Sequence, residues 1–178
     1  MPPLPPFYAI ILDMDVSILI DEEFADKLDS AWLERVMLKV FALEKVPENA
    51  EIGLLITGQS HIQELNKEYL GEDRPTDVLS FSMRPGKPEV SGERKEGEEP
   101  VFILPPDGIN HLGEVIVSYP QAELQAKEHG HSVEKEMAIL VIHGVLHILG
   151  YDHAEPDEER EMQRREAEIL ESLKDEVK

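Results

Sequence analysis

Cysteine is absent from this 178-residue sequence. Without it the protein can form no disulfide bond, thiolate metal site or cysteine nucleophile, so nitrogen and oxygen atoms would bind any zinc ion. Apolar runs of the roughly 20 residues that a transmembrane helix requires are also missing. The N-terminal segment lacks the basic residues typical of a secretory signal. We therefore expect a cytoplasmic protein without a membrane partner.

Basic residues are scarce, with 17 Lys and Arg against 38 Asp and Glu and a net charge of -21. Broad electrostatic binding to nucleic acid or anionic membrane needs clustered Lys and Arg, so this composition excludes it. A local site is still compatible with the charge, because the segment 73–84 holds two acidic and two basic residues. We expect no DNA partner, and any RNA contact should be confined to a few cations.

The hydrophobic pattern predicts a single domain of strands and helices over residues 1–178. Periods of two and of 3.6 residues distinguish strands from helices, and Pro and Gly mark several ends. The predicted strands cover 7–18, 51–57, 76–83 and 112–120, the last closed by a proline. The predicted helices cover 31–45, 60–70, 121–130, 132–150 and 155–176.

Two segments stand out within this pattern. Residues 132–150 are apolar nearly all round from Met137 to Leu149, which indicates a helix buried in the middle of the domain. Residues 84–100 are rich in Pro, Gly and charge and offer almost nothing to a core. We expect this stretch to be a mobile surface loop.

Three of the seven histidines lie within eleven residues, in the segment HGVLHILGYDH. His143 and His147 are four residues apart, so on a helix their imidazoles share one face. Gly150 can adopt the left-handed conformation that ends a helix, which would bring His153 back to the same site. Three imidazoles with an open fourth position are typical of a catalytic zinc site.

Each histidine could instead be an ordinary core residue. Two imidazoles one turn apart on an apolar helix would then each need a buried partner, which makes this interpretation less favourable. The spacing matches the zinc-protease pattern HExxHxxGxxH, but Gly144 replaces the glutamate that serves as its general base. The other four histidines lack such spacing, and we expect them to be ordinary residues rather than ligands: His61, His111, His129 and His131.

A second group of polar residues precedes the predicted strand 76–83. Arg74, Thr76 and Asp77 lie next to Pro75, which restrains the chain at this point. One interpretation is a turn with a solvated ion pair. The other is that these strand-end side chains project into the cleft bordered by the metal-binding helix.

Three motifs in this order resemble the YbeY endoribonucleases, also known as rRNA maturation factors. They are LNKEYLGEDRPTDVLSF (65–81), LGEVIVS (112–118) and HGVLHILGYDH (143–153). The resemblance implies an α+β domain in which a small mixed four-stranded sheet is combined with about five or six helices, the central one of which binds the metal. It also implies one zinc ion bound by His143, His147 and His153. The expected activity is zinc-dependent hydrolysis of single-stranded RNA, in 3′-end processing of small-subunit ribosomal RNA and in ribosome quality control.

Within such a site, a water whose pKa the metal lowers toward about 7 would attack the phosphodiester. Asp77 or Asp152 could act as the base, although either could equally orient a ligand imidazole. The family commonly has arginine after the tyrosine of its first motif, where this sequence has Leu70. Arg74 or Arg84 could take over that contact with RNA, and cleavage could otherwise be weakened.

Two other functions fit parts of the pattern. A metalloprotease would share the ligand spacing, but Gly144 removes its base. A non-enzymatic ribosome-assembly or binding factor with a mainly structural zinc is the stronger alternative, since Leu70 would then reflect lost catalysis. Ribosomal RNA and the ribosome are the expected partners in either ribosomal function.

Overall fold

The computed structural model describes residues 14–83 and 108–177. In chain order the elements are β1 (Asp15–Ile20), η1 (Glu22–Phe24), α2 (Ser30–Leu43), β2 (Ala50–Thr57), α3 (Gln59–Leu70), β3 (Val78–Ser82), β4 (Asn110–Ser118), α4 (Tyr119–His129), α5 (Val133–Ile148) and α6 (Pro156–Ser172). Five α-helices and a four-stranded sheet therefore occur in the described residues, which confirms the predicted α+β class.

The four strands form one mixed sheet in the order β1-β2-β4-β3. β1, β2 and β4 run parallel, whereas β3 is antiparallel to β4 and forms the far edge. Along β3 and β4, Val78 pairs with Val117 and Ser82 pairs with Gly113. The sheet therefore places β3 beside β4 and leaves the outer side of β3 without a strand partner in the described residues.

Gly113 occupies a bulge in β4. The pairing with β2 shifts between Glu51 and Ile52, so that Leu112 is an extra residue in the ladder. Gly113 has a φ of 141°, and a Cβ atom here would lie 2.0 Å from the carbonyl oxygen of Phe81. Only glycine allows the two strands to approach this closely.

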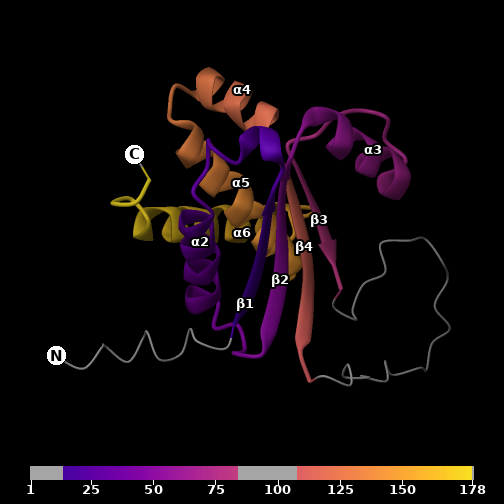
Figure 1. Cartoon of the computed structure of the whole chain (residues 1–178). Helices are drawn as coiled ribbons and strands as arrows, with labels where there is room; N and C mark the ends of the chain where they lie inside the picture. Colours follow the sequence, from indigo (N-terminus) through magenta and orange to yellow (C-terminus); the bar gives the residue numbers. More distant parts are fainter. Residues whose placement is uncertain (1–13, 84–107, 178) are drawn as a thin grey trace, which may run out of the picture.

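Helices cover the two faces of the sheet unequally (Figure 1). α2 and α5 pack on one face, and α6 packs outside them. The main core lies between these layers, and α5 contributes eight of its 16 residues to it. The predicted central helix is thus confirmed. α3 covers part of the other face over a smaller core of Ile62, Leu79 and Ile116.

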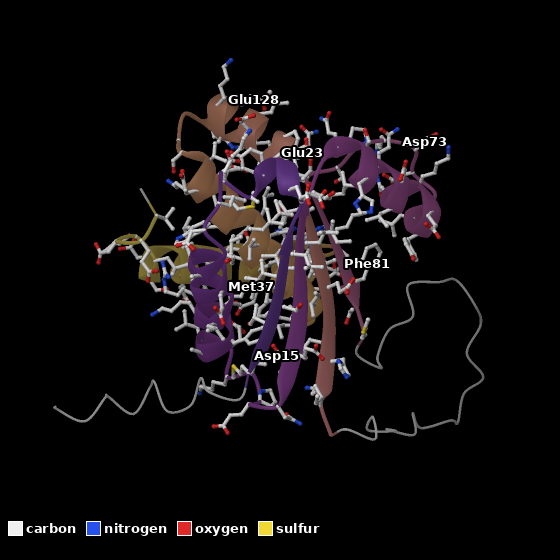
Figure 2. The ribbon with its side chains drawn as sticks, viewed as in Figure 1. Asp15, Glu23, Met37, Asp73, Phe81 and Glu128 are labelled. Carbon is white, nitrogen blue, oxygen red and sulfur yellow. The ribbon has the colours of Figure 1, made fainter. Side chains whose placement is uncertain are left out.

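Side chains follow this layering (Figure 2). Met37 of α2 is fully buried against the sheet, whereas Asp15, Asp73 and Glu128 are exposed on the periphery. No helix within 14–83 or 108–177 is long and apolar enough to cross a membrane. The large negative charge is therefore carried outside a conventional apolar core.

Several predicted boundaries are wrong. The first strand ends at Ile20 rather than at residue 18, and residues 7–13 of the prediction lie outside the described range. Pro120 does not close a strand but lies in the first turn of α4, where its missing N–H is no disadvantage. The predicted loop at 84–100 also lies outside the described residues.

Candidate metal centre

α5 places two histidines on one face, one turn apart. The helix begins at the N-cap Ser132, whose Oγ accepts a hydrogen bond from the backbone N–H of Lys135. It ends where the N–H of Gly150 donates to the carbonyl of His147, and Gly150 has a φ of 105°. This left-handed residue turns the chain back and brings His153 to the helix face.

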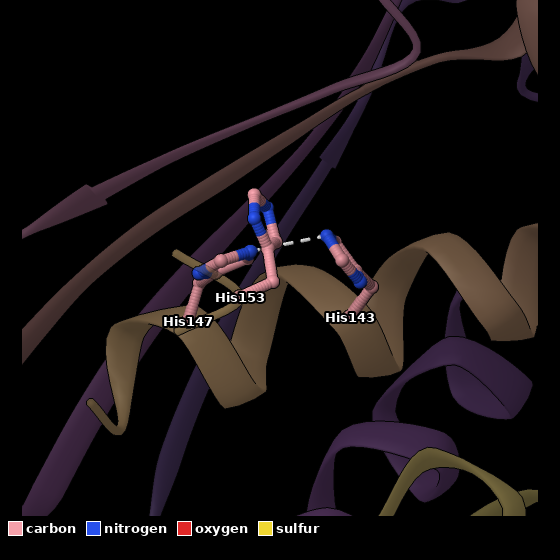
Figure 3. Close-up of side chains that lie close together, drawn as sticks. All are labelled: His143, His147 and His153. Carbon is pink, nitrogen blue, oxygen red and sulfur yellow. Dashed lines mark hydrogen bonds between the residues drawn. The ribbon is translucent and has the colours of Figure 1, made fainter. Parts of the chain in front are cut away.

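The imidazoles of His143, His147 and His153 converge on one point (Figure 3). Their potential ligand atoms all lie within 4.8 Å of one another, and the Nε2 atoms of His143 and His147 are 3.1 Å apart. Tetrahedral zinc with Zn–N bonds of about 2.0–2.1 Å places its ligand nitrogens about 3.3 Å apart. The three side chains could therefore hold a metal ion, and the spacing of His143 and His147 is close to that of two zinc ligands.

The surroundings of His147 also suit a metal. Burial lowers the pKa of His147, and the neighbouring His143 and His153 lower it further, while Asp152 acts in the opposite direction. The neutral imidazole is thus favoured at His147. Neutral imidazole is the form that binds a cation.

Glu166 of α6 orients one of the ligands. Its Oε1 lies 2.5 Å from Nδ1 of His143 and accepts the hydrogen bond from that nitrogen. This bond fixes the tautomer in which Nε2 of His143 is free for a metal. No local pattern predicts this role, because Glu166 is one of many acidic residues in a charged helix.

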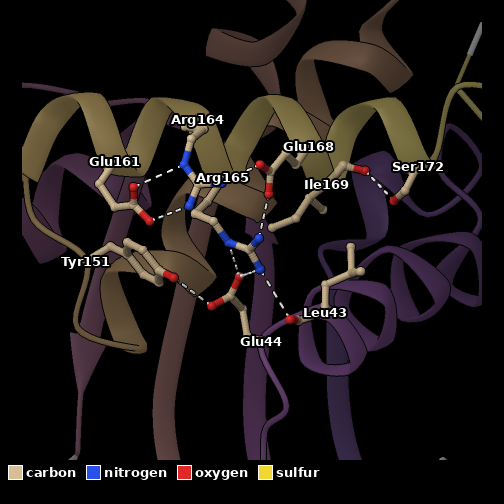
Figure 4. Close-up of polar contacts among 9 residues, drawn as sticks. All are labelled: Leu43, Glu44, Tyr151, Glu161, Arg164, Arg165, Glu168, Ile169 and Ser172. Atoms are coloured by element: carbon tan, nitrogen blue, oxygen red, sulfur yellow. Dashed lines mark hydrogen bonds and ion pairs between the residues drawn. The ribbon is translucent and has the colours of Figure 1, made fainter.

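A half-buried ion pair between Arg165 and Glu44 joins the segments around the metal centre (Figure 4). Nε of Arg165 donates to Oε1 of Glu44 at 2.8 Å, and the Tyr151 hydroxyl donates to Oε2 of the same carboxylate at 2.8 Å. Burial and the Glu44 contact raise the pKa of Tyr151, which keeps its hydroxyl protonated. Tyr151 is two residues before His153, and Arg165 is adjacent to Glu166. Glu44, at the end of α2, therefore positions both parts of the centre.

Gly144 lies between the two helical ligands, against the sheet. A Cβ atom here would lie 2.5 Å from Cγ1 of Val115 and 3.2 Å from Oγ of Ser80. The Ser80 hydroxyl also donates to the carbonyl of Gly144 at 3.1 Å. The helix thus has no room at this position for the glutamate of the zinc-protease pattern unless its neighbours move.

The two predicted catalytic aspartates occupy different surroundings. Oδ1 of Asp152 accepts a hydrogen bond from the backbone N–H of His153 at 2.7 Å, so this carboxylate is part of the ligand loop. Asp77 accepts hydrogen bonds from the backbone of Val78 at 2.8 Å and from the side chain of Gln125 at 3.1 Å. These bonds join the start of β3 to α4. Both catalytic assignments stay predictions.

Arg74 is exposed, and its guanidinium pairs with Glu72 at 2.6 Å. Such an exposed pair contributes little stability and leaves the cation accessible. The buried Asn66 donates to the carbonyl of Arg74 at 2.9 Å and thereby holds the loop. Asp73 pairs instead with Lys67. Arg84 lies outside the described residues, so the structure places only Arg74 of the two predicted RNA-binding arginines.

The four other histidines all have neighbours. Nδ1 of His61 lies 3.0 Å from the hydroxyl of Thr57, and His111 pairs with Glu51. His129 and His131 meet at Glu136, and these three residues form a second group that could hold a metal. Sequence spacing did not predict this group, because a turn rather than a helix brings the two histidines together.

Comparisons with known proteins agree with this geometry. The family model described as Endoribonuclease YbeY matches residues 18–174. The chain belongs to the YbeY family. An Endoribonuclease YbeY from Dehalococcoides mccartyi is 46% identical over 154 residues, which cover 85% of this chain and 87% of the relative. Another, from Geobacillus kaustophilus, is 38% identical over 150 residues, 84% and 88% of the two chains.

The fold is also similar to a known structure. A solution structure of a Thermotoga maritima protein matches with a TM-score of 0.56 and 29% identity, over 90% of each chain. The matched YbeY region includes all three histidines and Glu166, as well as Asp77 and Asp152. Family membership supports an endoribonuclease role and an RNA substrate for this chain.

Proposed function

We propose that this YbeY family member is a cytoplasmic, zinc-dependent endoribonuclease. Its proposed substrate is single-stranded RNA, in 3′-end processing of small-subunit ribosomal RNA and in ribosome quality control. The observation that carries the proposal is the convergence of His143, His147 and His153, with Glu166 on the outer nitrogen of His143.

This ligand set favours catalysis over a purely structural role. Structural zinc sites are almost always closed by four protein ligands, whereas catalytic sites use three and leave one position for water or substrate. The group found in the described residues has three. A zinc ion held there supplies Lewis-acid activation of water near neutral pH and stabilises negative charge on the phosphoryl oxygens.

The chain's own residues then hold and move protons around this centre. Glu166 keeps a proton on Nδ1 of His143, so that Nε2 would be free to bind the ion. Asp152 and Asp77 are the candidate acceptors for the proton of the attacking water. A general base contributes about 10²- to 10⁴-fold to rate, so the Asp152→Asn and Asp77→Asn variants distinguish the two. The variant that loses rate in this range, with unchanged zinc affinity, identifies the base.

The charge distribution favours a local RNA contact. A surface with net charge -21 repels a polyanion over most of its area. Among the arginines of α6, only Arg165 is largely covered by its pair with Glu44, whereas Arg160 and Arg164 carry exposed pairs like that of Arg74. Arg74 differs from them because it lies in the segment 73–84, where two basic residues balance two acidic ones. We therefore assign the phosphate contact to Arg74, together with Arg84.

The proposal is tested with single-stranded and duplex fragments of ribosomal RNA. Zinc-loaded protein should cleave the single strand, and His143→Ala should lose cleavage together with the zinc bound at this site. His111→Ala is the matched control, because that histidine pairs with Glu51 away from the cluster. Zinc binding without any cleavage would instead favour the assembly factor. Cleavage that persists in metal-free His143→Ala would refute the assignment.

A further inference from the structure

A second group of metal-ligating side chains lies at the joint between α4 and α5. His129 is the last residue of α4, and Gly130 follows with a φ of 70°, a conformation that suits glycine. This turn directs His129 and His131 toward Glu136 in the first turns of α5. Oε2 of Glu136 lies 3.3 Å from Nδ1 of His129 and 3.0 Å from Nε2 of His131.

Burial makes the charge of Glu136 costly unless a cation is present. The side chain of Glu136 is only 4% exposed, and a buried carboxylate needs a paired charge or a metal. Nδ1 of His131 lies 3.1 Å from the carbonyl of Ser132, which can only accept, so this nitrogen carries hydrogen. In the neutral ring, Nε2 then directs a lone pair at the carboxylate. Either a proton or a metal ion must lie between them.

The spacing fits a metal ion. Two imidazole nitrogens and one carboxylate oxygen form the donor set of catalytic His₂Glu zinc sites. Ligand atoms of a tetrahedral zinc are about 3.3 Å apart, close to the separations of 3.0 and 3.3 Å found here. The side chain of His129 is 59% exposed, which gives solvent access to the remaining coordination position.

We propose that His129, His131 and Glu136 bind a second divalent transition-metal ion of the zinc class. The site is separate from the first, because Glu136 and His143 are seven residues apart, roughly 10 Å along the helix. Buried Leu140 lies between them on the same face. The bound ion cross-links the end of α4 to the start of α5, the helix that carries His143 and His147.

Metal titration tests the proposal with the full chain. Metal-stripped protein should bind two equivalents of Co²⁺ or Zn²⁺, and His129→Ala should bind one tightly. The His143→Ala/His147→Ala double variant should retain one equivalent. That ion is bound at the second site, so the result does not depend on metal binding at the first site. Because His129 is exposed, its replacement should leave the folded protein intact, whereas a variant at the buried Glu136 could fail to fold.

The decisive comparison is made in the double-variant background. Adding His129→Ala should weaken the remaining site at least tenfold, since loss of even an outer-shell partner typically costs 10- to 100-fold in metal affinity. Adding His111→Ala should change nothing. The metal should also raise the melting temperature of the double variant but not of the triple variant with His129→Ala. Absence of saturable binding in the double variant, or equal affinity after His129→Ala, would overturn the proposal in favour of a protonated His–Glu cluster.

Discussion

The Gly144→Ala variant tests how closely the metal-binding helix must approach the sheet. The added Cβ would lie 2.5 Å from Cγ1 of Val115 and 3.2 Å from Oγ of Ser80. Val115 is fully buried in β4 and cannot turn its branched side chain into solvent. Either α5 or the strand must therefore shift, and a shift of α5 also moves His143 and His147.

The expected magnitude combines two opposing terms. Overpacking a core typically costs about 1–3 kcal/mol, whereas alanine is favoured over glycine in a helix interior by about 1 kcal/mol. Because the closest contact is deep and buried, we expect a net destabilisation of about 1–2 kcal/mol. For a domain of this size each kcal/mol lowers the melting temperature by about 2–4 °C.

Chemical denaturation in the presence of a chelator measures this effect without a contribution from bound metal. The matched control is a double-mutant cycle with Val115→Ala, which removes both Cγ atoms near the new methyl group. In that background the cost of Gly144→Ala should fall by about 1 kcal/mol or more, as the helix propensity of alanine dominates. A Gly144→Ala protein as stable as the parent, with the same cost in both backgrounds, would refute the packing argument.

Three further predictions concern the metal centre and its surroundings. Glu166→Ala should weaken zinc binding about 10- to 100-fold in a chelator competition assay, because it removes the acceptor of His143; Glu171→Ala on the same helix, which pairs with exposed Lys174, should not. Arg74→Ala/Arg84→Ala should reduce RNA cleavage strongly at unchanged zinc content. It should also flatten the plot of log affinity against log salt by about one unit per lost phosphate contact, and an unchanged slope would move the RNA path elsewhere. Deleting most of 86–99 should leave the melting temperature nearly unchanged, since the β3–β4 pairing holds the flanking strands and loop closure depends weakly on length; a large loss would show that the segment packs.

The sequence predicted those features that depend on local spacing. The 3.6-residue pattern located α5, and the interval between His143 and His147 placed two ligands on one face before any fold was known. Gly150 predicted the turn that returns His153. Each of these inferences needs only the geometry of one helix and its end, which neighbouring residues determine.

Features that depend on tertiary contacts could not be predicted in this way. Glu166 and Arg165 lie in a helix rich in acidic and basic residues, and nothing local distinguishes them from their solvated neighbours. Their roles arise only when α6 packs beside α5 and the end of α2. Glu136 likewise resembles an ordinary acidic residue of a helix N-terminus. It becomes the centre of the cluster with His129 and His131 because it is buried and because the chain turns at Gly130.

Reconstitution of RNA cleavage with zinc tests the central claim most directly. Metal-stripped His129→Ala protein, in which the second site is disabled, is titrated with zinc while cleavage of a single-stranded ribosomal RNA fragment is followed. The rate should rise in proportion to added zinc and reach its plateau at one ion per chain, and His147→Ala should show no rise. Full cleavage by the stripped protein, or an equal rise in the His147→Ala variant, would contradict a catalytic zinc at His143, His147 and His153.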